Sequence, residues 1–175
     1  MLSWLTGRSL LKTKAGELYG KVVAAARQPA FYGPSRVSDT PEGRFELIAL
    51  HLFLVVERIK DIAPDGPEIA RHMIEAFVVD MDDCMREMGV GDLTVPKRVK
   101  RAAAGFYERA GAFRAALSSA SQSDLEQAMA DYVLTEALTS NYRPALAVYV
   151  RQSHNGFAKL SNAEVIAGAV AFAEP

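Results

Sequence analysis

The sequence predicts an all-α protein, a single-domain bundle of six to seven helices around a buried central helix near residues 41–62. Segments with helical periodicity follow one another along the chain, and short links that contain proline or glycine join them. No alternation of apolar and polar residues bounded by turns indicates a strand. With 175 residues, 50% of them hydrophobic, the chain is long enough to build one substantial core.

The first segment, residues 1–30, is basic and helical in this interpretation, with a helix expected over residues 15–27. Residues 1–27 hold five basic side chains against one acid, together with the apolar anchors Trp4, Leu2, Leu5, Leu10 and Leu11. This composition suits an amphipathic helix that contacts an anionic membrane. The alternative is a terminus that packs on the bundle. Residues 31–175 then form the main helical domain.

The central helix is predicted over residues 41–62. Thr40 suits the N-cap, and Pro41 suits the first turn, where its missing N–H leaves no hydrogen bond unmade. The helix is apolar almost all the way round, so other elements must cover most of its sides. It is too short, and too interrupted by Glu46 and His51, to span a bilayer.

Further helices are predicted over residues 66–88, 96–117, 123–138, 144–160 and 162–172. Capping boxes formed by Asp65 with Glu68 and by Ser123 with Glu126 open two of them. A proline opens each of the helices that begin at 96 and 144. These helices complete the predicted bundle.

The helix over residues 66–88 is amphipathic, and its apolar face is rich in methionine. Phe77, Met81, Met85 and Met88 lie on that face at helical spacing. Methionine is flexible and polarizable, so the face is a candidate surface for an apolar segment of another protein. The alternative is that the stripe fills the core, which is the usual role of an apolar helical face.

Charge is distributed unevenly in the middle of the chain. Residues 61–92 hold nine acids against two bases, and residues 96–114 hold six bases against one acid. Lys97, Arg98, Lys100 and Arg101 stand in the first turns of a predicted helix, where the helix dipole disfavours cations. Anionic lipid, nucleic acid or the acidic helix would compensate them. Motifs for sequence-specific nucleic-acid binding are absent from the sequence.

Neither catalysis nor metal binding is expected from the titratable residues. His72 has acidic neighbours, but a di-iron bundle needs Glu-x-x-His pairs, and the sequence holds none. His51 lies in an apolar helix, and we expect a hydrogen-bonded core or boundary histidine in preference to a ligand. Cys84, the single cysteine, lies on an apolar face where burial makes a thiol inert. We therefore expect a non-enzyme without cofactor or metal.

Three blocks of sequence resemble the bacterial branch of the ubiquinol–cytochrome c chaperone family. They are FYGPSRVSDTPEGRFEL from residue 31, DMDDCMREMGVGDL from residue 80 and VPKRVK from residue 95, and the resemblance covers roughly residues 31–150. It implies a non-enzymatic assembly chaperone that binds newly made cytochrome b and aids assembly of the cytochrome bc1 complex. It also implies a cytoplasmic protein, peripheral at the inner membrane. Analogy with the family alone suggests two further partners, a small partner protein and the ribosome.

Three sets of residues are named, the first because it matches the family motif and the other two as physical hypotheses. The motif residues are expected to be structural, as turn glycines, a helix cap and an Arg–carboxylate pair: Tyr32, Gly33, Asp39, Thr40, Gly43, Arg44 and Glu46. A groove for the client is hypothesised from the central helix and the methionine-rich helix: Phe45, Leu47, Leu50, Leu54, Phe77, Met81, Met85 and Met88. The four cations at 97–101 are the hypothesised membrane or anionic-partner patch.

Two points stay open on the sequence alone. Leu47, Leu50 and Leu54 lie opposite the main apolar face of their helix, so they either contact a second layer of the bundle or are exposed for a client. Two other functions also remain as alternatives. One is a small helical metal-binding protein or enzyme that uses His72 and nearby carboxylates, and the other is a general interaction module.

Overall fold

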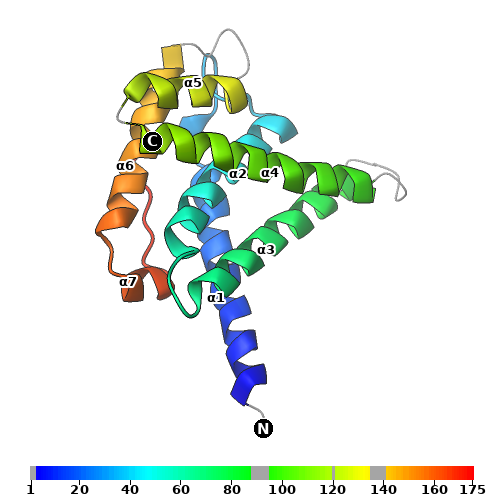
Figure 1. Ribbon diagram of the computed structural model, residues 1–175. Helices are drawn as coiled ribbons and strands as arrows, with labels where there is room; N and C mark the ends of the chain where they lie inside the picture. Colours follow the sequence, from blue (N-terminus) through cyan, green and yellow to red (C-terminus); the bar gives the residue numbers. More distant parts are fainter. Residues whose placement is uncertain (1–2, 88–94, 120, 135–140) are drawn as a thin grey trace.

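The computed structural model describes residues 3–87, 95–119, 121–134 and 141–175 of the chain (Figure 1). These residues form helices and no strand, apart from one isolated bridge between Tyr32 and Val37. The prediction of an all-α bundle is confirmed. The elements are α1 (Ser3–Ala26), the short 3-10 helix η1 (Pro29–Phe31), α2 (Pro41–Ile59), α3 (Gly66–Glu87), α4 (Val95–Ser118), α5 (Gln122–Tyr132), α6 (Arg143–Lys159) and α7 (Asn162–Ile166).

Helix α2 is the centre of the bundle. It contacts α1, α3, α4, α6 and α7, so other helices cover most of its surface. Buried side chains therefore occur all round it, from Leu47 to Val55 without interruption. Leu47, Leu50 and Leu54 are fully buried, so a second layer of the bundle covers them. The prediction of a buried central helix is confirmed.

The outer helices form two groups around α2 (Figure 1). Helix α1 packs on α2 and α3, and Tyr19 of α1 donates a hydrogen bond to Asp80 of α3 at 2.8 Å. Helices α3 and α4 diverge from one end like the arms of a V, while α5 and α6 pack together on the other side of the molecule. The N-terminal part of α1 extends beyond the other helices.

Local chemistry fixes the start of α2 as the sequence predicts. The Thr40 hydroxyl accepts a hydrogen bond from the Gly43 N–H at 3.1 Å, and Pro41 stands in the first turn. Gly43 has a steric role as well, because a Cβ at this position would lie 2.0 Å from the Ser38 carbonyl oxygen. The connection before α2 can therefore pass directly against the helix.

Two arginines donate hydrogen bonds to the backbone carbonyls at the carboxyl ends of neighbouring helices. Arg58 of α2 donates to the carbonyls of Phe157 and Leu160 at 3.0 and 2.7 Å, where α6 ends. Arg151 of α6 donates to the carbonyls of Leu117 and Ser119 at 3.4 and 3.5 Å, where α4 ends. A cation at this place also complements the negative end of the helix dipole.

Several predicted helix ends are wrong. Helix α1 begins at Ser3 and not at residue 15, so the helix includes most of the basic N-terminal segment. Helix α5 ends at Tyr132 and not at 138, and Ser121, not Ser123, is its N-cap. The last helix ends at Ile166 and not at 172, and Gly168 just beyond it has a φ of 85°.

The chain after α7 returns along α6 as an extended segment (Figure 1). Phe172 packs edge-on against Phe157, with ring centroids 5.1 Å apart. The Ala173 N–H donates to the Ser153 hydroxyl at 3.0 Å. The segment is therefore extended and not helical as predicted, and single side chains attach it to the bundle.

Candidate functional site

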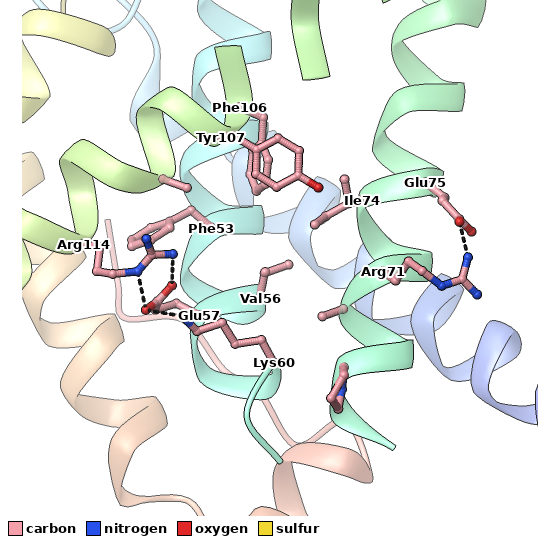
Figure 2. A pocket seen from close by; sticks show the side chains of 13 residues that line it. Phe53, Val56, Glu57, Lys60, Arg71, Ile74, Glu75, Phe106, Tyr107 and Arg114 are labelled. Carbon is pink, nitrogen blue, oxygen red and sulfur yellow. Dashed lines mark hydrogen bonds and ion pairs between the residues drawn. The ribbon is translucent and has the colours of Figure 1, made fainter. Parts of the chain in front are cut away.

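An apolar hollow of about 500 Å³ lies between α2, α3 and α4 (Figure 2). Each of the three helices supplies part of its floor: Val56 from α2, Ile74 from α3, and Phe106 with Ala110 from α4. Phe106 is 1% exposed and anchors this wall in the core, where its ring packs against that of Phe77. The hollow exists because α3 and α4 diverge over α2 and leave its outer surface partly uncovered.

Tyr107 forms a lip of the hollow and is 61% exposed. Its ring touches Phe106 edge-on at 5.6 Å between centroids. A tyrosine in this setting offers an apolar ring and a polar hydroxyl to whatever occupies the hollow.

Charged side chains stand on two opposite edges of the hollow (Figure 2). On the α2–α4 edge, Arg114 donates two hydrogen bonds of 2.8 Å to the Glu57 carboxylate, and Lys60 lies 3.0 Å from the same group. Burial by itself raises the pKa of the Glu57 carboxyl, but the two cations outweigh it and hold that pKa below its usual range. Glu57 is therefore ionised at neutral pH.

The α3 edge carries a second charged cluster around Arg71. Its guanidinium donates to Glu68 at 2.5 Å and also pairs with Glu75. His72 lies 2.9 Å from Glu75 through Nδ1, so three of the residues considered for a metal site do come together. Arg71 already pairs with the carboxylates of Glu68 and Glu75, and no group of three or more described His, Cys, Asp or Glu side chains is arranged so that it could hold a metal ion. This arrangement suits a solvated, salt-bridged helix surface.

The hypothesised client-binding residues are placed elsewhere. Leu47, Leu50, Leu54 and Phe77 are fully buried, Met81 is 7% exposed, and Phe45 packs beside Phe77 with ring centroids 5.6 Å apart. The side chain of Met85 and the whole of Met88 lie outside the described residues. None of the six described members lines the hollow. Their contact with a client stays a prediction, and it requires the bundle to open.

Sequence reasoning did not find the hollow. Phe53 and Val56 lie in a helix that is apolar on every side, so nothing in the sequence separates its floor-facing residues from its core residues. The sequence does contain one indication of the hollow. Phe106 and Tyr107 are two adjacent aromatics in a helix whose other residues are mostly small or charged. Periodicity places two adjacent aromatics on different faces of the helix.

The motif residues hold the connection before α2 and the first turns of α2 in place. The Tyr32 hydroxyl donates to the Ala26 carbonyl at 2.7 Å, and Gly33 has a φ of 136°. Arg44 pairs with Asp39 at 2.7 Å on the surface. These contacts, together with those of Thr40 and Gly43, fasten the connection; that the motif serves only this structural role stays a prediction.

Glu46 has a different environment from the other motif residues. Its carboxylate pairs with Arg109 of α4, through an Nε hydrogen bond of 2.6 Å, and both side chains are largely buried. Arg109 also lies over the rings of Phe45 and Tyr132, 5.4 Å from each centroid. Burial raises the pKa of the Glu46 carboxyl, and Arg109 lowers it only in part. The pair locks α2 to α4 beside the wall of the hollow.

His51 is a buried hydrogen-bonded histidine, which confirms the sequence prediction. Its Nδ1 lies 2.7 Å from the Leu47 carbonyl and its Nε2 lies 2.7 Å from the Tyr149 hydroxyl. Because a carbonyl only accepts, Nδ1 carries the proton and Nε2 accepts from Tyr149. Burial lowers the pKa of His51 to about 4. The histidine is thus a neutral link between α2 and α6.

The basic residues at the start of α4 face solvent. Lys97, Lys100 and Arg101 are exposed. The side chain of Arg98 lies outside the described residues. On α1, Leu10 is 56% exposed. Among helices over the described part of the chain, none combines the length and apolar composition needed to cross a membrane.

Comparison with known proteins places this architecture in a family. A family model described as ubiquinol-cytochrome C chaperone matches residues 35–172. The match continues past residue 150, where the sequence resemblance stops, and includes α6, α7 and most of the extended segment. No curated protein matches the chain.

A solved structure supports the same placement. "Crystal structure of the Cbp3 homolog from Brucella abortus" is similar to this chain, with a TM-score of 0.87 and 33% sequence identity. The alignment covers 99% of this chain and 97% of that chain. The similarity therefore extends over the whole bundle, including helix α1, which lies before the residues that the family model matches.

Proposed function

The chain belongs to the ubiquinol–cytochrome c chaperone family, and we propose that it binds newly made cytochrome b and aids assembly of the cytochrome bc1 complex. The observation that carries this proposal is the family match, which spans residues 35–172 and so most of the bundle. An assembly chaperone needs a surface that holds an apolar segment and later releases it. The hollow between α2, α3 and α4 is the surface of that kind that we assign to this task.

The chemistry of the hollow supports binding in preference to catalysis. Its floor is apolar, and its charged side chains, Glu57 and Arg71 among them, are engaged in ion pairs. None of the lining residues is a cysteine, serine or histidine placed beside a general base. We therefore propose that the protein works without covalent chemistry.

Deletion of the gene tests the proposed function. We expect loss of assembled bc1 complex on native gels, while pulse-labelling shows normal synthesis of cytochrome b. Unchanged levels of the complex would refute the proposal. Crosslinking in the native cell then identifies the client, and it also names any small partner protein or ribosome contact.

We also propose peripheral contact with the cytoplasmic face of the inner membrane. The exposed Lys97, Lys100 and Arg101 support it, as does the basic α1 with its exposed Leu10. Each cation near an anionic surface contributes about 1 kcal/mol. Replacing all four cations of residues 97–101 by glutamine should weaken binding to vesicles that contain anionic lipid, measured by co-sedimentation. Equal binding of variant and wild type would show that this patch has no membrane role.

A further inference from the structure

Residues 169–175, which we call the strap, lie along α6 with few attachments of their own (Figure 1). The strap follows Gly168, whose φ of 85° turns the chain after the end of α7. Val170 is 6% exposed, and Phe172 is partly buried against the core. In the described part of the chain, no backbone–backbone hydrogen bond involves residues 170–175. A segment with so few backbone hydrogen bonds can open locally while the bundle stays folded.

The strap covers the buried His51 of α2. The Phe172 ring stands edge-on to the imidazole, with ring centroids 4.9 Å apart. The rings of Phe31 and Tyr149 also pack against the imidazole, and these two residues are themselves buried. Of the three rings, that of Phe172 belongs to a residue that is partly exposed. The strap is therefore the layer that separates His51 from water on this side.

A chain of hydrogen bonds also joins the strap to His51. The Ala173 N–H donates to the hydroxyl of the buried Ser153 at 3.0 Å. Burial raises the pKa of Tyr149, and the Ser153 hydroxyl beside it lowers that pKa in part, as a donor to a phenol oxygen does. Tyr149 in turn donates to His51 Nε2 at 2.7 Å. Every donor in the chain therefore points from the strap toward the imidazole.

The direction of this chain depends on a neutral imidazole. Neutral His51 accepts at Nε2, because its Nδ1 proton is held by the Leu47 carbonyl at 2.7 Å. A protonated imidazole donates from both nitrogens, so the Tyr149 hydroxyl would have to turn toward Ser153, whose own proton would then need a new acceptor. The closed strap would also keep the imidazolium charge from water, which costs free energy. Protonation of His51 and closure of the strap therefore oppose each other.

The groups around the imidazole add no charge that would offset this opposition. Tyr149 is the titratable side chain that faces His51 from α6, whereas η1 and the strap present the uncharged rings of Phe31 and Phe172. Glu174, the acidic residue of the strap, is exposed. Burial lowers the pKa of His51 to about 4, and its backbone hydrogen bond raises that pKa only in part. The neutral imidazole thus matches the closed strap.

We propose that residues 169–175 form a proton-linked strap, which closes over neutral His51 and opens about Gly168 when this histidine takes a proton. The device goes beyond the proposed function and does not depend on it. The coupling works in both directions, so a partner that displaces the strap also lets His51 take up a proton. With an ordinary histidine pKa of about 6.5 in the open state, linkage makes opening about twentyfold more favourable at pH 5 than at pH 7.

Amide hydrogen exchange followed by NMR tests the coupling in the full chain. The protection factor of the Ala173 amide, which compares its exchange rate with the intrinsic rate at the same pH, should fall about twentyfold from pH 7 to pH 5. His51→Gln should abolish this dependence, because glutamine does not titrate. His154→Gln, on α6 beside Ser153, is the matched control and should keep it. A constant protection factor in the wild type, or an equal fall in His51→Gln, would overturn the proposal.

NMR titration of the imidazole gives a second measurement that leaves His51 unchanged. In the wild type the His51 midpoint should lie near pH 4, and deletion of residues 169–175 should move it about two pH units upward, toward the ordinary value. Phe172→Ser should move it in the same direction by a smaller amount, because part of the cover remains. Val79→Ser removes an exposed apolar side chain from α3 and should leave the midpoint in place. The proposal fails if the deletion and Phe172→Ser both leave the His51 midpoint unchanged.

Discussion

The ion pair between Glu46 and Arg109 gives the sharpest prediction about stability. Arg109→Met keeps the length and apolar stem of the side chain but removes its charge. The Glu46 carboxylate, with 15% of its side chain exposed, then has no cation beside it. Removing one partner of a buried pair destabilises proteins by about 3 kcal/mol, largely because the remaining charge stays desolvated. We expect a loss of about that size in the free energy of unfolding.

The loss should depend on pH in a definite direction. Burial already raises the folded-state pKa of Glu46 above its unfolded value, and loss of Arg109 raises it further. A carboxyl group with a raised folded pKa favours folding when it is protonated, so its contribution is present at low pH and is lost as pH rises through the folded pKa. The penalty of Arg109→Met should therefore be smaller at pH 5 than at pH 8.

Urea denaturation followed by circular dichroism measures the effect, with Arg44→Met as the matched control. Arg44 and Asp39 form an ion pair with both side chains 55% exposed, so its loss should change stability far less. Adding Glu46→Gln to Arg109→Met removes the stranded charge and should recover about 1 kcal/mol. The reasoning is refuted if Arg109→Met costs no more than Arg44→Met, or if its cost does not grow with pH.

Three further predictions concern other parts of the bundle. The contribution of His51 to stability should fall by about 3 kcal/mol as pH falls from 6.5 to 4, because burial lowers its pKa to about 4 and the unfolded chain binds a proton first. His51→Gln should flatten that profile, and identical profiles would contradict it. Gly43→Ala should cost about 3 kcal/mol in urea denaturation, because its Cβ would meet the Ser38 carbonyl, whereas Gly111→Ala on the open face of α4 should gain about 0.5–1 kcal/mol. Thr40→Ala should cost about 1 kcal/mol by removing the N-cap of α2, and an unchanged urea midpoint would exclude that role.

Much of the fold could be predicted because its signals are local. The N-cap at Thr40 and the proline that follows it act within one turn, so the start of α2 was found to the residue. The burial of His51 with hydrogen-bond partners followed from a single polar residue inside an apolar helix. Helix ends were less predictable. Phe172 continues a helical pattern in sequence but lies in an extended segment, because its ring packs on His51 and Phe157.

The candidate site was not predictable from the same signals. Leu54 and Val56 are both aliphatic residues of α2, yet Leu54 is fully buried and Val56 lines the hollow. What separates them is the direction in which α3 and α4 cross α2. Crossing angles depend on side-chain packing along whole helices and on the loops that join them, so no local pattern encodes them.

The amino-acid sequence by itself determined the helices, the central position of α2 and the family of the chain. The helices follow from periodicity and capping residues, which act over a few neighbouring residues, and the family follows from ordered sequence motifs. Only the tertiary structure decided that the bundle itself covers Leu47 and Leu50, and that Tyr107 borders an open hollow. The physical reason is that periodicity tells which side chains avoid water, whereas the packing of distant helices decides what covers them.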